Sequence, residues 1–213
     1  LTVIQDTIDM VKQNKNVEID FSKDKMDDPK VFKQWQDGNS MGIFQFESQG
    51  MTNFMKELKP DCLEDIIAGV SLYRPGPMDQ IPRYIANKKN PEHAVYTHDS
   101  LKPILKVTYG CMVYQEQVMQ IVRELAGYSL GRADLVRRAM GKKKLDVMAK
   151  EREIFINGQV DENGNVIVPG CVRNGIDAKS ANKIFDEMAE FAKYAFNKSH
   201  AACYAVVAYR TAY

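Results

Sequence analysis

The chain has 213 residues, of which 45% are hydrophobic and 27% charged, and its formal net charge is +1. This composition is typical of a globular protein that is large enough to bury a core. No apolar run reaches the roughly 20 residues needed to span a bilayer, and no charged-then-apolar signal opens the sequence. These patterns exclude a membrane-spanning helix and an amino-terminal signal, so we expect a cytoplasmic protein with no membrane partner.

The four cysteines are far apart, with neither a Cys-x-x-Cys pair nor a nearby histidine to complete a zinc set: Cys62, Cys111, Cys171 and Cys203. We interpret them as reduced thiols and expect no metal site. The sequence opens on Leu1 and stops inside a helical pattern at Tyr213, without a C-cap signal. We therefore expect the chain to be a piece of a longer protein.

Helical patterns dominate the sequence. The first half predicts helices over residues 4–14, 28–38, 48–58, 61–73, 78–88 and 98–106. The second half predicts helices over residues 114–126, 130–140, 145–157, 177–194 and 198–213. Asp28 and Pro29 supply an N-cap and a first-turn proline, and Gly38 closes that helix. The Arg74-Pro-Gly-Pro sequence must end its helix, because a residue before proline avoids the α region.

Short extended segments are expected in three places. Residues 41–46 fit a strand or a turn, and residues 109–113 fit one extended segment. In residues 158–170, Asn163-Gly164 is a hairpin turn dipeptide between β-branched residues. The predicted fold class is therefore mainly α, with many helices and a small β-hairpin near 158–170.

Charge is distributed unevenly despite the near-zero total. Residues 1–70 carry 8 basic and 13 acidic side chains, a local −5, whereas residues 132–152 carry 8 basic and 3 acidic ones, a local +5. Such segregation favours one face that suits a polyanion and another that faces solvent or a partner. The alternative is a solvated basic helix, since Lys and Arg are common on surfaces.

The most basic segment combines a capped helix with two kinds of cation. Ser129 can cap a helix that carries Arg137 and Arg138 opposite its apolar face of Ala133, Leu135, Val136, Ala139 and Met140. The exit loop after it holds Lys142, Lys143 and Lys144. Arginine binds phosphate oxygens bidentately and lysine acts as a point charge, a mixture that suits a triphosphate or a nucleic-acid backbone. A Walker-type phosphate loop is rejected, because Gly141-Lys142 is followed by lysine rather than Ser or Thr.

The last helix has polar groups in its first turn only. Asn197 can cap it, Lys198, Ser199 and His200 follow, and almost everything from there to Tyr213 is apolar or aromatic. We expect this helix to be buried on most sides. Because a helix N-terminus favours anions, the added cation, hydroxyl and imidazole predict a phosphate-binding corner. An ordinary N-cap with solvated side chains is the simpler alternative.

Five motifs occur in order along the chain: Gly42-Ile-Phe-Gln-Phe-Glu-Ser48, Ser71-Leu-Tyr-Arg-Pro-Gly-Pro77, Tyr109-Gly-Cys-Met-Val-Tyr-Gln-Glu-Gln-Val-Met119, Leu135-Val-Arg-Arg-Ala-Met-Gly-Lys-Lys-Lys144 and Phe196-Asn-Lys-Ser-His-Ala201. Together they resemble the motifs of the bacterial replicative DNA polymerase III alpha subunit, a family C polymerase. The resemblance covers essentially the whole chain, and it is closer to the standard alpha subunit than to the form with an inserted exonuclease.

The resemblance implies a fingers domain over residues 1–213, with residues 1–40 as the palm-to-fingers junction. It implies a DNA-directed DNA polymerase as the parent, with primer/template DNA, dNTP and other replicase subunits, including the sliding clamp, as partners. The parent's Mg²⁺ ligands are expected upstream of Leu1, so the chain by itself should bind no cofactor and be inactive. Resemblance and charge together assign dNTP or phosphate binding to Arg74, Arg137, Arg138, Lys142, Lys198, Ser199 and His200, and DNA binding to Lys143 and Lys144.

Each of these assignments has a rival. Arg74 could simply brace its turn, and Glu116 is either a hidden acid-base group or the exposed start of a helix. The whole chain could instead be a non-enzymatic helical module that binds nucleic acid through the +5 segment. It could also be a protein-interaction scaffold that docks through its acidic first third.

Overall fold

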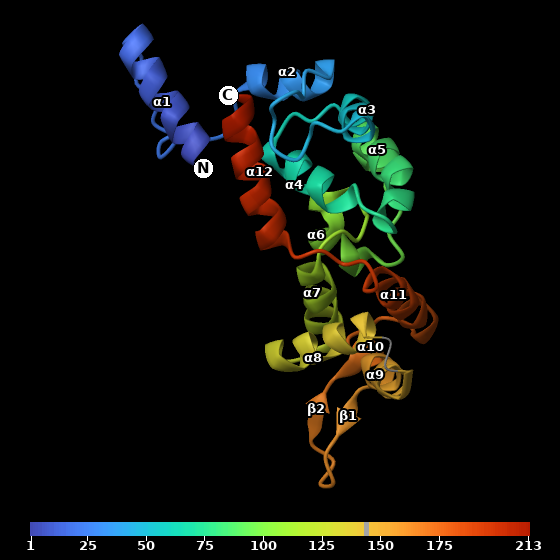
Figure 1. Ribbon diagram of the computed structural model, residues 1–213. Helices are drawn as coiled ribbons and strands as arrows, with labels where there is room; N and C mark the ends of the chain where they lie inside the picture. The colour runs from blue at the N-terminus through green and yellow to red at the C-terminus, as the bar shows by residue number, and fades with distance from the viewer. Residues whose placement is uncertain (143–144) are drawn as a thin grey trace. The chain divides into compact units, whose positions relative to one another are not determined.

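The computed structural model describes residues 1–142 and 145–213 and is mainly helical, with one two-stranded antiparallel sheet (Figure 1). The helices in the first half are α1 Thr2–Lys15, α2 Pro29–Asp37, α3 Gln49–Leu58, α4 Leu63–Leu72, α5 Ile81–Lys89 and α6 Lys102–Leu105. Those in the second half are α7 Gln115–Ala126, α8 Leu130–Gly141, α9 Leu145–Asn157, α10 Gly170–Arg173, α11 Ala178–Phe191 and α12 Lys198–Ala212. The strands are β1 Gln159–Val160 and β2 Val166–Val168. The predicted fold class is confirmed.

Helix boundaries follow local capping chemistry. The Asp28 carboxylate accepts the Lys30 N–H at the start of α2, and Gly38 ends this helix at φ 80°. The Ser48 and Ser129 hydroxyls accept the N–H groups of Met51 and Arg132 at the starts of α3 and α8. Each cap satisfies a donor that the first turn leaves without an intrahelical partner. None of the helices in the described ranges is long and apolar enough to cross a membrane.

The chain divides into two compact units, residues 1–73 with 199–213, and residues 74–198. In the first unit, the aromatic side chains of α2 pack on one face of α12 and on the turn before α3. The Phe32 and Tyr209 rings lie 5.7 Å apart, and the Trp35 and Phe46 rings lie 5.5 Å apart. The Tyr209 hydroxyl also accepts the Asp28 N–H at 3.0 Å. These contacts anchor the last helix of the chain to the beginning of α2.

In the second unit, the core forms where α7, α8, α9 and α11 meet. Its largest ring pair is Phe155 of α9 and Phe185 of α11, both fully buried, with centroids 5.7 Å apart. Five apolar residues of α7 recur at helical spacing and are buried: Val118, Ile121, Val122, Leu125 and Ala126. This core fixes the positions of α7 and α8, and α8 carries the candidates Arg137 and Arg138.

Residues 41–46 form turns, which is one of the two alternatives that the sequence left open. Three details of the sequence prediction are wrong. Residues 98–106 divide into a 3-10 turn at Asp99–Leu101 followed by the short helix α6. Leu135 is 66% exposed, so it lies outside the buried face of α8. In α12 only Ala201, Ala205, Ala208, Tyr209 and Ala212 are buried. A narrow stripe of alanines packs closely on one side, and the other apolar residues of this helix stay at least partly exposed.

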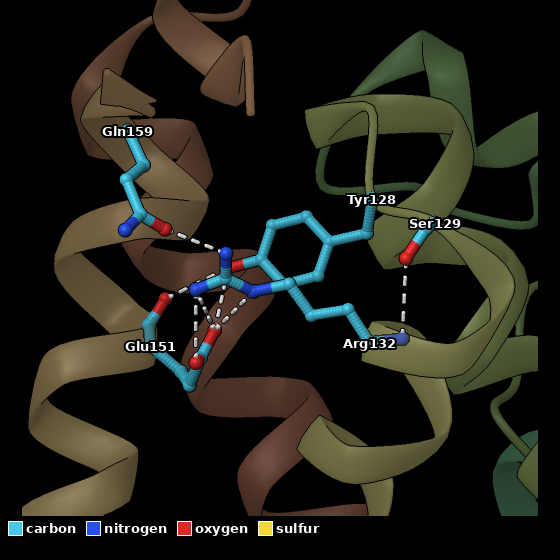
Figure 2. A network of polar contacts seen from close by, with 5 residues as sticks. All are labelled: Tyr128, Ser129, Arg132, Glu151 and Gln159. Carbon is cyan, nitrogen blue, oxygen red and sulfur yellow. Dashed lines mark hydrogen bonds and ion pairs between the residues drawn. The ribbon is translucent and has the colours of Figure 1, made fainter. Parts of the chain in front are cut away.

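A polar network joins the start of α8 to α9 and β1 (Figure 2). The Arg132 guanidinium pairs with the Glu151 carboxylate at 3.1 Å and donates to Gln159 Oε1 at 2.6 Å. It lies 5.0 Å from the centre of the Tyr128 ring, whose hydroxyl donates to Glu151 at 2.9 Å. Burial, reinforced by the Glu151 charge, raises the pKa of Tyr128 and keeps this hydroxyl protonated as a donor.

This network should contribute measurably to folding. Glu151→Gln removes the charge that Arg132 pairs with, and both side chains are mostly buried, at 15% and 23% exposed. We expect the free energy of unfolding to fall by about 2 kcal/mol, below the value for a fully buried pair because water still reaches both groups. Glu153→Gln, on the exposed side of the same helix, should change it by less than about 0.5 kcal/mol. Urea unfolding of both variants tests this, and equal losses would contradict it.

Candidate phosphate-binding site

The start of α7 is fixed by a buried glutamine. The Gln117 Oε1 accepts the N–H groups of Val113 and Tyr114 at 2.8 and 3.0 Å, and its Nε2 donates to the Thr108 hydroxyl at 2.8 Å. Because Gln117 is almost completely buried, these bonds form away from competing water. They hold residues 114–116 in one place at the N-terminus of the helix.

Residues 194–198 run as a connecting segment from α11 to the first residue of α12 and lie along the start of α7. Tyr114 and Phe196 form an isolated parallel bridge, in which the Gln115 N–H donates to the Phe196 carbonyl at 2.8 Å. The Gln115 Nε2 also donates to the Ala195 carbonyl at 3.1 Å. The predicted extended segment at 109–113 is therefore displaced by a few residues, and its pairing partner lies about eighty residues away in sequence.

Arg74 contacts the same connecting segment through a hydrogen bond and a cation–π interaction. Its Nη2 donates to the Tyr194 carbonyl at 2.7 Å, and its guanidinium carbon lies 4.2 Å from the centre of the Phe196 ring. A Cβ on Gly76 would lie 2.4 Å from the Tyr194 ring, so the glycine lets the Arg-Pro-Gly-Pro loop approach this ring closely. Burial lowers the pKa of Arg74 from its ordinary value. These contacts fit the alternative role in which Arg74 braces the local backbone, and a phosphate contact by Arg74 stays a prediction.

Lys198 is held at the opposite end of the segment by Glu116. The two carboxylate oxygens of Glu116 lie 3.1 and 3.0 Å from the Lys198 backbone nitrogen, and one of them accepts from Asn197 Nδ2 at 2.8 Å. The Lys198 ammonium lies 5.2 Å from the centre of the Tyr114 ring. Glu116 therefore takes a backbone donor that the sequence analysis predicted for a phosphate, and anion binding by the Lys198 ammonium stays a prediction.

The two candidate arginines of α8, Arg137 and Arg138, have different surroundings. Asp134 pairs with both at 2.7 Å, and Arg137 Nη1 donates to Gln115 Oε1 at 3.1 Å. The Arg137 side chain is only 22% exposed whereas that of Arg138 is 62% exposed, so the prediction of two surface arginines is correct for Arg138 alone. The hydrogen bond from Arg137, with further ones from Arg138, lowers the pKa of Asp134. One carboxylate thus offsets one of two positive charges.

The remaining predicted residues are Lys142, Lys143, Lys144, Ser199 and His200. Lys142 is exposed at the C-terminal end of α8. Lys143 and Lys144 lie outside the described residues. Ser199 and His200 belong to the first unit, where both are exposed at the beginning of α12 and the His200 ring centre lies 4.4 Å from that of Tyr204.

The structure adds three polar residues that the sequence did not single out as ligand-positioning groups. They are Gln115, Glu116 and Asp134, and they bond Arg137, Lys198 and Arg138. The sequence offered one weak signal, the polar run 115–117 that opens an amphipathic helix. Through Gln115, Glu116 and the Tyr114 ring, both Arg137 and Lys198 contact a single stretch, residues 114–116.

The described residues contain one cluster with the composition of a metal site, Asp61, Cys62 and Asp65, whose candidate donor atoms lie within 4.8 Å of one another. One Asp65 oxygen accepts the Asp61 N–H at 3.1 Å across the start of α4. Burial and the Asp65 charge raise the pKa of Cys62 to about 11, so its thiol is protonated at neutral pH. Because Mg²⁺ prefers oxygen ligands, this cluster does not fit the metal pair of a nucleotidyl transfer enzyme.

Comparison with known proteins decides the family. A model of the bacterial DNA polymerase III alpha subunit finger domain matches residues 1–163. The chain belongs to this family. It is 48% identical to the DNA polymerase III subunit alpha of Thermus aquaticus and 47% identical to that of Rickettsia bellii, in both cases over 100% of the chain. It is 51% identical to that of Chlamydia trachomatis over 88% of the chain.

The polymerase III alpha relatives are much longer than this finger-domain chain. The chain spans 17% of the length of the Thermus and Rickettsia proteins and 14% of the Chlamydia protein. The alignments to the first two relatives include α11, the connecting segment and α12, which lie beyond the family match that ends at residue 163. The candidate site is therefore built from both the finger-domain match and the sequence that follows it.

Proposed function

We propose that this chain is the fingers part of a bacterial replicative DNA polymerase and binds the triphosphate of the incoming dNTP. The observation that carries the proposal is the convergence of Arg137 and Lys198 on residues 114–116, with Arg138 joined through Asp134. Two arginines and a lysine offer bidentate and point-charge contacts to phosphate oxygens. Family membership makes a deoxynucleoside triphosphate the expected anion.

In the parent reaction, the primer 3′ hydroxyl attacks the α-phosphate and pyrophosphate leaves. The fingers would contribute by holding the β- and γ-phosphates and by balancing the charge that develops on the leaving group. Lys198 and the two arginines supply that charge. Ser199, His200, Lys142 and Arg74 remain proposed nucleotide contacts, and Lys143 and Lys144 remain proposed contacts to DNA.

The parent requires parts that this chain does not supply. We propose that Mg²⁺ is held by carboxylates elsewhere in the alpha subunit, and that the chain alone extends no primer. Template and primer DNA and the other replicase subunits, the sliding clamp among them, are the proposed partners, and the cytoplasm is the proposed location. Templated extension by the pure chain would refute this division of labour.

Thermal unfolding of the chain with different ligands tests triphosphate binding. We expect dTTP at 100 times its dissociation constant to stabilise the chain by about 2.7 kcal/mol, and thymidine, which lacks phosphates, to have no such effect. Salt-sensitive binding of single-stranded DNA with no effect of dTTP would favour the nucleic-acid module instead. Absence of both effects would favour the interaction scaffold.

A further inference from the structure

We propose that Gln115 and Glu116 are positioning residues for the proposed triphosphate site, which makes this inference depend on the proposed function. They are the first two residues of α7 and are adjacent in sequence. Gln115 contacts Arg137 of α8, and Glu116 contacts Lys198, the first residue of α12. Two side chains that share one rigid helix start would hold the two phosphate-binding cations in a fixed relation to each other.

Gln115 uses both ends of its amide. Its Oε1 accepts from Arg137 at 3.1 Å, and its Nε2 donates to the Ala195 carbonyl at 3.1 Å. The hydrogen bonds from Arg137 to Asp134 lie within α8. Among the described contacts, the bond to Gln115 is the one that connects the Arg137 guanidinium to another helix, α7. Loss of the amide would leave Arg137 paired with Asp134 but no longer oriented toward the connecting segment.

Glu116 fixes the point where the chain enters α12. Its carboxylate bonds the Lys198 N–H and the Asn197 side chain, and a carboxylate is favoured at a helix N-terminus by the helix dipole. All of the described contacts of this carboxylate are to donors that stay protonated at neutral pH. This arrangement makes Glu116 a holder of the Lys198 backbone and argues against the acid-base role that the sequence left open.

Both residues act at a distance from the phosphates. Displacement of a binding group by about 1 Å can cost roughly a hundredfold in rate, so an orienting contact can matter as much as a direct one. A purely structural role would lower stability and leave nucleotide use unchanged once the protein is folded. A positioning role changes the Michaelis constant for dNTP in a protein of normal stability.

The experiment uses the full-length alpha subunit with primed template and steady-state single-nucleotide incorporation. Gln115→Ala is expected to raise KM for dNTP about tenfold, the effect of losing a hydrogen bond to a charged group. Gln120→Ala is the matched control, because Gln120 lies exposed on the same helix and bonds Glu124. It should leave KM unchanged within about twofold.

A double-variant cycle isolates the coupling. If Gln115 acts through Arg137, the double variant Gln115→Ala with Arg137→Ala should have no higher KM for dNTP than Arg137→Ala alone. If the two residues act independently, their fold-changes in KM should multiply.

For Glu116, Glu116→Gln keeps an acceptor for the Lys198 N–H and should retain most of the activity. Glu116→Ala should raise KM about tenfold, and Glu124→Gln is its exposed control.

The outcomes separate the positioning role from the site itself. An unchanged KM for Arg137→Ala and Lys198→Ala would overturn the proposed function and this inference together. The positioning role alone would be overturned if Arg137→Ala raised KM for dNTP while Gln115→Ala left it normal. It would also be overturned if the effects of the two substitutions on KM were fully multiplicative. Should Gln115→Ala fail to fold in a thermal melt, Gln115→Leu decides, since it keeps a side chain of similar size and removes the acceptor for Arg137. A Gln115→Leu variant that folds but leaves KM for dNTP unchanged would then refute the inference.

Discussion

Arg137→Ala is expected to lower kcat/KM for dNTP incorporation by the full-length alpha subunit by tenfold to a hundredfold. Of the two candidate arginines of α8, Arg137 is more buried than Arg138 and is oriented by a second element, so it should make the more defined phosphate contact. Loss of a charged hydrogen bond costs about 1.5–3 kcal/mol, which corresponds to that range of rates. Arg137→Lys should recover only part of the loss, because lysine cannot bind bidentately.

Arg138→Ala provides the comparison within the same helix. Its side chain is 62% exposed, so its removal should change the free energy of unfolding by less than about 0.5 kcal/mol and should affect kcat/KM less than Arg137→Ala does. Arg123→Ala, exposed on α7, is the control for a general loss of positive charge. A loss for Arg123→Ala as large as that for Arg137→Ala would indicate a diffuse electrostatic effect in place of a site.

Gly170→Ala should be among the most destabilising substitutions in the chain. Gly170 has φ 77°, and an added Cβ would lie 2.3 Å from the Gly158 backbone nitrogen, where the hairpin leaves α9 and enters α10. The left-handed conformation and the backbone clash together should cost about 3–5 kcal/mol of unfolding free energy. Denaturant unfolding measures this directly.

Gly131→Ala is the opposite case and serves as the control. Gly131 lies on the exposed side of α8, and an added Cβ would meet nothing within 4 Å. Because glycine is a poor helix former, this change should stabilise the chain by about 0.5–1 kcal/mol. A loss of less than about 1 kcal/mol for Gly170→Ala would show that packing at the hairpin base is looser than the structure indicates.

Sequence predicted the helices well because their ends depend on adjacent residues. Asp28, Ser129 and Gly38 act within one turn of the boundary that they set, so their roles can be read directly. The errors fall where tertiary packing decides. Burial of α12 depends on which neighbours cover it, and the short helix α10 depends on the glycines that close the hairpin.

The candidate site was predictable in its charges but not in its connections. The charges of the basic segment and of the start of α12 both predicted anion binding. Both segments also contain motifs that resemble those of the polymerase family. What brings them together is the pairing of Tyr114 with Phe196 and the bonds of Gln115 and Glu116, which link positions about eighty residues apart. Such contacts leave no periodic trace in a sequence, because glutamine and glutamate are also ordinary residues for a first helical turn.

Equilibrium binding of dNTP to the full-length alpha subunit on primed template is the most direct test of a triphosphate site at Lys198. Lys198→Ala should raise the dissociation constant about tenfold, as expected for a charge lost near a helix end. Lys193→Ala removes an exposed charge five residues earlier in the chain and should leave the dissociation constant nearly unchanged. Equal affinities for the wild type and Lys198→Ala would show that Lys198 does not bind the triphosphate.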